Sequence, residues 1–304
     1  MAKTPDGGRT GRPARGERSA VVKLTGGLGN QLFQYAAARA LCLREERRLR
    51  LAWFGPADGS RRYLLDQFRL AGPPEVSLAG RDEIRGLWTS LPRWQKNLTR
   101  LGLWPRPRQL RVSGPAFRPL AGSGRTVFLE GYFQSWRYFD DCRDRIREEL
   151  TITAPLGERN ASLLRRIAGE NSVAIHVRRG DYVGLPHHGV LPLDYYRVAL
   201  GRLAPALDGA RVFVFSDDPA WVRANFEVGR PVEVIDHNGP DSPVGDLALM
   251  AACRHFLIAN STLSWWAAWL ASHQGKRVIA PRQWFGAARA ADTSDLCPPD
   301  WQRL

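Results

Sequence analysis

The segment Asn171–Tyr182, NSVAIHVRRGDY, joins an apolar run to a short and highly charged stretch. Residues 172–177 are mostly apolar, which predicts a buried strand. Arg178, Arg179 and Asp181 follow at the end of that strand. Two guanidinium groups beside a carboxylate could form a structural salt bridge. They could equally bind an anion next to a catalytic acid or base. The surrounding sequence has to distinguish these two interpretations.

Strands and helices alternate clearly from about residue 170 onward. We expect apolar strands at 172–177, 211–215, 232–236, 255–259 and 277–280, with helices at 193–204, 218–226, 244–253 and 261–273. Strands that alternate with helices form parallel sheets through right-handed crossovers. This half of the chain is therefore predicted to be a Rossmann-type domain.

The first half begins in a similar way. An apolar strand at 19–24 precedes a glycine-rich turn, an amphipathic helix at 31–45 and a second strand at 47–53, which is how an α/β domain opens. Residues 126–150 repeat the order of strand, loop and helix, whereas residues 72–118 permit no assignment. We expect a flexible basic tail at 1–18, an N-terminal α/β domain at 19–168 and the Rossmann-type domain at 169–304. A cleft between the two domains is the expected ligand site.

Composition indicates a globular protein. The 304 residues are 44% hydrophobic and include 11 tryptophans, a content that disordered chains lack. The four cysteines are scattered and form no CxxC pair, which favours a reducing compartment and a cytoplasmic location. The N-terminal residues lack the apolar core of a signal peptide, and no apolar run of about 18 residues predicts a membrane span.

The positive charge lies almost entirely in the first half. Residues 1–150 contain 28 lysines and arginines against 15 acidic residues, whereas residues 151–304 contain 16 against 15. A basic surface could contact nucleic acid, an anionic membrane or an acidic substrate. Because 40 of the 44 basic residues are arginine, a general compositional bias explains the charge equally well, and the charge decides nothing alone.

Polar residues follow three of the predicted strands of the second half, where ligands of open α/β sheets bind. Besides the arginine pair, these are Ser216, Asp217, Asp218, Asn260, Ser261 and Thr262. The acidic pair could ligate Mg²⁺, cap the next helix or hold a ribose hydroxyl. The Asn-Ser-Thr segment could be a plain N-cap or a phosphate site. With arginines at a neighbouring strand end, the combination favours a diphosphate site.

Two other motifs have competing interpretations. The turn TGGLGN at 25–30, with Gly27 and Gly29, lacks the GxGxxG spacing of dinucleotide sites. It could serve a tight turn with positive φ or a close approach of the backbone to a ligand. His187 and His188 are adjacent and have no third ligand nearby in sequence. A loop position or a single catalytic imidazole is therefore favoured over a metal site.

Together these motifs resemble a known family. The set GGLGNQLFQYA, GYFQSWRYF, HVRRGDY, FSDD, LMAACRHFLIANSTLSWWAAWL and APRQWF occurs in order between residues 26 and 285. It is similar to that of the bacterial α-1,2-fucosyltransferases of glycosyltransferase family 11. One departure is Leu263, where the family often has phenylalanine. Residues 72–118 match no motif, and we expect acceptor choice to lie there.

The resemblance implies an α/β, GT-B-like fold of two Rossmann-type α/β domains facing a cleft. Residues 169–304 would bind GDP-β-L-fucose and residues 19–168 would form the acceptor side. Fucose would pass, with inversion, to the 2-hydroxyl of a galactose in a glycan. No metal or other cofactor is expected, since arginines would supply the positive charge.

The resemblance also implies roles for particular residues. Arg178 would hold the β-phosphate, with His176 and Arg179 shaping the pocket and Arg179 pairing Asp181. The remaining donor-binding candidates are the strand-end residues Ser216, Asp217, Asp218, Asn260, Ser261 and Thr262, with Ser261 and Thr262 at the diphosphate.

The turn after the first strand would form the opposite wall of the cleft, through Gly27, Gly29, Asn30 and Gln31. Inversion needs a base for the acceptor hydroxyl, and Asp181 and His188 are the two candidates.

Three alternatives remain at this stage. A GDP-fucose transferase could form another linkage, α-1,6 or α-1,3. A basic nucleic-acid-binding protein would explain the charge, but the sequence has no RNA-binding aromatic motif or Cys/His finger, so no nucleic acid partner is expected. A sugar-binding module would explain the tryptophans. The expected acceptor is a glycan such as a lipid-linked oligosaccharide, with peripheral contact to an anionic membrane as a further hypothesis.

Overall fold

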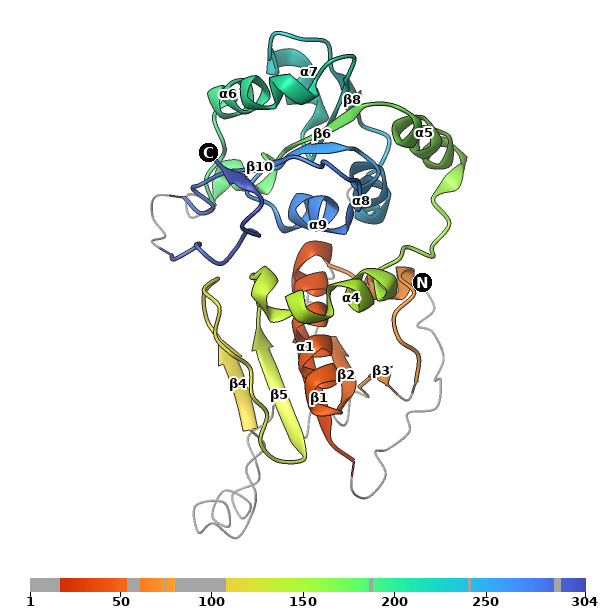
Figure 1. The fold of residues 1–304 in the computed structure, drawn as a ribbon, viewed down its shortest axis with the longest axis vertical. Coiled ribbons are helices and arrows are strands. Elements are labelled where there is room, and N and C mark those ends of the chain that lie inside the picture. The colour runs from red at the N-terminus through yellow and green to blue at the C-terminus, as the bar shows by residue number, and fades with distance from the viewer. Residues whose placement is uncertain are drawn as a thin grey trace. The chain divides into compact units, whose positions relative to one another are not determined.

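The computed structural model describes residues 17–53, 61–73, 75–79, 108–185, 188–239, 242–286 and 291–304. Within these residues the chain forms two compact units. One consists of residues up to Phe133 together with Arg137–Thr151, and the other of Gln134–Trp136 together with Ile152–Leu304. Each unit contains one sheet whose strands all pair in parallel (Figure 1).

The first unit is built on a five-stranded parallel sheet in the order β3-β2-β1-β5-β4. Its elements are β1 (Ser19–Leu24), α1 (Leu28–Glu45), β2 (Arg48–Trp53), β3 (Val76–Leu78), β4 (Arg108–Val112), β5 (Thr126–Gly131) and α4 (Arg143–Glu149), with short 3₁₀ turns at Leu65–Gln67, Trp136–Tyr138 and Asp140–Cys142. The predicted strand–turn–helix–strand opening is confirmed. Strands β3 and β4 lie in the stretch that the sequence left unassigned, and most of that stretch falls outside the described residues.

Helix α1 carries the core of this unit. Its side chains from Leu28 to Cys42 are almost all buried, except that of Asn30, and the helix packs along β1 and β2 (Figure 1). Gly26, just before the helix, has φ +79°, a value that glycine adopts without a Cβ penalty. The turn before the helix therefore needs at least one of its glycines for backbone conformation alone.

The second unit is built on a six-stranded parallel sheet in the order β11-β10-β9-β6-β7-β8. Its elements are α5 (Gly157–Gly169), β6 (Ser172–Val177), α6 (Leu193–Leu203), β7 (Arg211–Ser216), α7 (Pro219–Asn225), β8 (Glu233–Ile235), α8 (Pro243–Ala251), β9 (His255–Leu257), α9 (Thr262–Leu270), β10 (Val278–Ala280) and β11 (Gln302–Arg303), with 3₁₀ turns at Asp181–Gly184 and Ala204–Ala206. The five predicted strands are present, and β11 adds a short sixth.

The unit boundary differs from the expected division at residues 168 and 169. Helix α5 packs against α8 and therefore belongs with the second sheet, so the chain changes unit after Thr151. Residues 1–16 of the expected basic tail lie outside the described residues.

The tryptophans of α9 form core, not surface. Trp265 and Trp266 are completely buried, and Trp265 packs against Trp269 and Trp301 with ring centroids 6.2 and 5.4 Å apart. The indole nitrogen of Trp265 donates to the carbonyl of Leu296 at 2.9 Å. These rings are therefore not available as a sugar-binding platform. No helix in the described part of the chain has both the length and the apolar character of a membrane span.

Candidate active site

Two neighbouring strands of the second sheet, β6 and β7, bring four of the predicted charged residues together. Strands β6 and β7 pair in register, with Val177 opposite Ser216, so Arg178 and Arg179 emerge beside Asp217 and Asp218. We call these four residues, with Asp181, the strand-end cluster. The ends of adjacent parallel strands meet at one edge of a sheet, which is why residues 38 positions apart in sequence become neighbours.

Arg178 lies between two carboxylates. Its Nη2 donates to Asp181 Oδ1 at 2.6 Å, and its Nη1 lies 3.2 Å from Asp217 Oδ2. The Arg178 side chain is about a quarter exposed, so part of it remains accessible from solvent. The predicted pairing of Asp181 with Arg179 is wrong, because Asp181 pairs with Arg178.

Asp217 holds the turn that carries the arginines. Its Oδ1 accepts a hydrogen bond from the backbone N–H of Arg179 at 2.9 Å. A Cβ added to Gly180 would fall well inside van der Waals contact with Asp217 Oδ2. Asp217 therefore supports the shape of the turn, and only glycine allows so close an approach. A ribose contact, which the sequence suggested, remains a prediction.

Arg179 faces away from Asp181 toward α7. Its guanidinium lies 3.8 Å from the centroid of the Trp221 ring, and its Nε lies 3.8 Å from Asp218 Oδ2. Asp218 is the N-cap of α7, since its Oδ1 accepts from the backbone N–H of Trp221 at 3.0 Å. Ser216 Oγ in turn accepts from the N–H of Asp218 at 3.0 Å. Of the three interpretations of the acidic pair, the structure therefore shows helix capping, by Asp218.

His176 is a buried, neutral imidazole at the end of β6. Burial and then the charge of Arg178 lower its pKa to about 3. Its Nδ1 is buried without a hydrogen-bond partner among the described residues. The side chain therefore contributes shape and no positive charge to the strand-end cluster.

Asn260 connects three loops at the end of β9. Its side-chain amide donates to the carbonyls of His188, Gly189 and Trp284 at 2.8, 3.0 and 3.2 Å. The side chain is almost fully buried. Sequence reasoning placed Asn260 at the donor, but the amide nitrogen is used to join backbone segments. Donor contact by this nitrogen would require these bonds to break.

Helix α9 begins at Thr262, with Ser261 as its N-cap residue. Within the described structure the Ser261 side chain makes no capping hydrogen bond; instead its carbonyl accepts from Ser264 Oγ at 3.1 Å. The described structure therefore does not support the interpretation of Ser261 as a side-chain cap of α9. A phosphate contact by Ser261 and Thr262 stays a prediction.

The glycine-rich turn of the first unit leads into α1, and its contacts are structural. Gly27 is the N-cap of α1, and Gly29, Asn30 and Gln31 lie in its first turn. The completely buried Gln31 donates through Nε2 to the carbonyls of Gly26 and Arg62 at 3.1 and 2.8 Å. Its Oε1 accepts from the N–H of Leu64 at 3.0 Å. Gln31 thus holds the following loop, and the predicted acceptor role of this turn remains untested.

Two aromatic residues of the site escaped the sequence reasoning. The Tyr182 ring stacks on His188 with centroids 4.4 Å apart and lies 5.0 Å from the Arg178 guanidinium. Trp221 lies under Arg179 in the same way. An aromatic residue near an arginine in sequence is a weak signal, because the contact depends on how the turn folds back. His187 lies outside the described residues.

A partly buried carboxylate in the first turn of α8, that of Asp246, was also missed. Asp246 Oδ1 accepts from Asn238 Nδ2 at 2.9 Å, and Asn238 is bonded through its Oδ1 to Asn160 of α5 at 2.8 Å. Burial raises the pKa of Asp246 to about 6. Among the described residues no group of three or more His, Cys, Asp or Glu side chains is arranged to hold a metal ion.

The fold matches that of a solved fucosyltransferase. The chain resembles the NodZ α-1,6-fucosyltransferase in a crystal soaked with GDP-fucose, with a TM-score of 0.54 at 18% identity over 84% of this chain and 93% of that one. This likeness shows the fold alone, and the fold is the GT-B fold of fucosyltransferases. The expected fold class, α/β with two Rossmann-type units, is confirmed.

The chain belongs to glycosyl transferase family 11, whose family model matches residues 12–304. Its relatives include, in Escherichia coli, the O-antigen biosynthesis glycosyltransferase WbnK, 31% identical over 92% of this chain and 99% of that protein. They also include an Escherichia coli alpha-1,2-colitosyltransferase, 31% identical over 93% and 98%. The bovine galactoside alpha-(1,2)-fucosyltransferase 2 is 31% identical over 83% of this chain and 68% of its own length.

Proposed function

We propose that this protein is an inverting α-1,2-fucosyltransferase that moves L-fucose from GDP-β-L-fucose to the 2-hydroxyl of a galactose in a glycan. The observation that carries the proposal is Arg178, whose partly exposed side chain lies at the end of a central strand of the second unit, in a chain of glycosyl transferase family 11. A relative named as a galactoside α-1,2-fucosyltransferase supports the acceptor and the linkage. The second unit would bind the donor, and the first unit the acceptor.

Arg178 has the chemistry to bind the diphosphate and to stabilise the leaving group. A guanidinium binds phosphate oxygens through two parallel N–H bonds. Asp217 holds the turn through the Arg179 N–H and lies against the other side of the Arg178 guanidinium. In the reaction the bond between the anomeric carbon and the β-phosphate oxygen breaks, and both electrons leave with GDP. Arg178 then faces the developing phosphate charge, which is the arrangement that lowers such a barrier.

The acceptor oxygen would attack the anomeric carbon from the side opposite GDP, which inverts the configuration and gives an α-linkage. Its proton must pass to a base. Asp181 and His188 both remain candidates. Asp181 is already hydrogen-bonded to Arg178, so it would serve as base only while also contacting the phosphate-binding arginine. His188 carries an imidazole, the side chain that most often serves as a general acid or base.

A second donor deserves the same test. The relative named alpha-1,2-colitosyltransferase is as similar to this chain as the WbnK protein. The match covers nearly the entire length of both this chain and that relative. Colitose is fucose without its 3-hydroxyl, so one pocket could accept GDP-activated forms of both sugars. Discrimination between them would depend on a polar group that contacts the 3-hydroxyl.

The test is an assay of GDP release with β-galactoside acceptors and linkage analysis of the product. GDP-fucose and GDP-colitose are compared, each with and without EDTA. We expect turnover with GDP-fucose, an α-1,2 product and no loss with EDTA. Equal turnover with UDP-galactose would refute the donor, an α-1,6 or α-1,3 product would refute the linkage, and abolition by EDTA would refute metal-independent catalysis.

We further propose a cytoplasmic enzyme that contacts the inner membrane surface and acts on a lipid-linked oligosaccharide. The excess of 28 basic over 15 acidic residues in positions 1–150 motivates this, because juxtamembrane basic clusters bind anionic lipid. We expect binding to vesicles containing anionic lipid at low salt that is lost at high salt. Absence of binding at low salt would contradict the membrane contact while leaving the transfer reaction intact.

A further inference from the structure

Tyr182 is the residue that links the arginine of the strand-end cluster to the candidate base. It follows Asp181 in the 3₁₀ turn Asp181–Gly184, which is separated from the end of β6 by Arg178, Arg179 and Gly180. Its ring lies 5.0 Å from the Arg178 guanidinium. The same ring stacks on the His188 imidazole, with centroids 4.4 Å apart and planes only 14° apart. One half-buried side chain therefore contacts two groups that the proposed reaction needs.

Hydrogen bonds connect Tyr182, Asn260 and His188 in a closed circuit of contacts. The Tyr182 hydroxyl donates to the carbonyl of Asn260 at 3.3 Å, and the Asn260 amide donates to the carbonyl of His188 at 2.8 Å. His188 is thus held at its ring by Tyr182 and at its backbone by Asn260. Because Asn260 is buried at the end of β9, this circuit ties the His188 loop to the sheet.

We propose that Tyr182 is a positioning residue, which orients the Arg178 guanidinium for the diphosphate and the His188 ring for the acceptor. This inference rests on the proposed function. The stacked ring favours one orientation of each partner, since a cation over an aromatic face and an offset aromatic pair are both geometrically selective. The hydroxyl contributes less, because its hydrogen bond is long and ends on a backbone carbonyl that remains in place without it.

The arginine has other contacts, and these set the size of the effect. Asp181 and Asp217 continue to hold Arg178 when the ring is removed. Tyr182→Leu should therefore weaken GDP binding by about two- to fivefold, the amount expected for one cation–π contact at a partly exposed site. Tyr182→Leu also removes the ring that stacks on His188. We expect kcat to fall by about two- to tenfold, because this factor corresponds to the usual interaction energy of one aromatic pair.

The experiment compares four variants of the full chain with the unaltered protein. Tyr182→Leu and Tyr182→Met remove the ring, Tyr182→Phe keeps it, and Val183→Ala changes the exposed neighbour in the same turn. For each protein the Kd for GDP is measured by calorimetry, kcat and KM for GDP-fucose by GDP release, and folding by thermal melting. The methionine variant replaces the leucine variant if the latter does not fold.

We expect the ring-free variants to melt near the unaltered protein, with a raised Kd for GDP and a separate fall in kcat. Tyr182→Phe should restore both to within about twofold, the rescue that distinguishes the ring from the hydroxyl. Unchanged Kd and kcat in the ring-free variants would overturn the inference, as would a phenylalanine variant as impaired as they are. Failure of the unaltered protein to bind GDP would overturn the proposed function itself, and this inference with it.

Discussion

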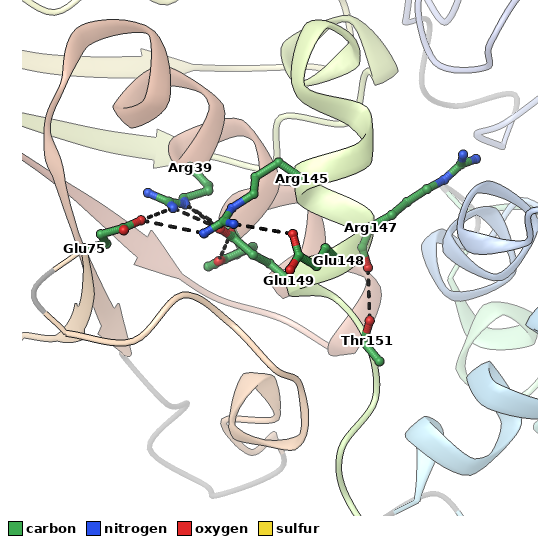
Figure 2. A network of polar contacts seen from close by, with 8 residues as sticks. Arg39, Glu75, Arg145, Arg147, Glu148, Glu149 and Thr151 are labelled. Atoms are coloured by element: carbon green, nitrogen blue, oxygen red, sulfur yellow. Dashed lines mark hydrogen bonds and ion pairs between the residues drawn. The ribbon is translucent and has the colours of Figure 1, made fainter.

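The buried ion pair of the first unit allows a sharp prediction about stability. Figure 2 shows Glu149 of α4 meeting Arg39 of α1, with Arg145 and Glu75 beside them. Arg39 Nε lies 3.1 and 3.0 Å from the two oxygens of Glu149, and the side chains of both residues are 3% exposed. The Tyr35 hydroxyl also donates to Glu149 at 2.5 Å. The carboxylate thus accepts hydrogen bonds on both oxygens.

The perturbation is Glu149→Gln, which keeps the shape and removes the charge. Removing one partner of a buried pair typically costs about 3–5 kcal/mol, because the other charge stays buried. Glu75 still contacts Arg39 Nη2, although its own side chain is 56% exposed, so we expect the lower end, about 3 kcal/mol. For a unit of this size that corresponds to a fall in melting temperature of roughly 6–12 °C.

Glu148→Gln is the matched control on the same helix. Its carboxylate is 56% exposed and lies 3.4 Å from Arg145 Nη1, and exposed pairs contribute at most about 1 kcal/mol. Calorimetry at pH 7 compares the two variants, with hydrogen exchange in α1 and α4 to assign the affected transition to this unit. Equal melting temperatures for both variants would refute the reasoning, since burial would then have no consequence.

The pH dependence provides a second check on the same pair. Burial alone would raise the pKa of Glu149, but the hydrogen bonds from Arg39 and Tyr35 outweigh it, and the net pKa is lowered. A lowered pKa in the folded state means that the stabilisation is fully present above the ordinary pKa of the carboxyl. It is lost as pH falls through the lowered value. The unaltered protein and Glu149→Gln should therefore converge in stability in acid.

Three further predictions concern the second unit. Arg178→Ala should lower kcat by about 10²–10³, the usual cost of one group that stabilises transition-state charge, as measured by GDP release; a near-normal rate would show that the phosphate lies elsewhere. Gly180→Ala should raise the Kd for GDP without preventing folding, because its Cβ would displace Asp217 Oδ2 and with it the turn; calorimetry showing unaltered GDP affinity would contradict this. Asp246→Asn should stabilise the protein at pH 7.5 by up to about 3 kcal/mol, because its raised pKa of about 6 makes the ionised form costly above that pH. The gain should nearly vanish at about pH 3, below both the folded and the ordinary pKa, where Asp246 is largely protonated in both states, and thermal melting with equal gains at pH 7.5 and at this acid pH would argue against burial as its cause.

Much of the fold could be predicted from local pattern. The apolar run 172–177 and its counterparts in the second half became parallel strands because their residues are buried on both faces. Short edge elements were harder. Strand β11, only Gln302–Arg303, has no apolar pattern and exists because it pairs with β10. Strand β3 has three residues and lies in a stretch whose composition predicted nothing.

The sequence predicted which residues belong to the site better than it predicted which of them contact one another. The sequence placed Arg178, Arg179, Asp217 and Asp218 directly after predicted strands, and the pairing of β6 with β7 brings these four residues together. It paired Asp181 with the wrong arginine. Which of two adjacent arginines faces a given carboxylate depends on the backbone path after β6, and that path is held by Asp217, which follows the neighbouring strand β7.

By itself the sequence determined the alternation of strands and helices, the family and the chemical character of the strand ends. These depend on short-range periodicity and on residue types, which need no knowledge of partners. Only the tertiary structure decided that Asn260 joins loops, that Gln31 holds a turn, and that Tyr182 contacts both Arg178 and His188. The physical reason is that a polar or aromatic side chain can satisfy its contacts in many ways, and the packed chain selects one of them.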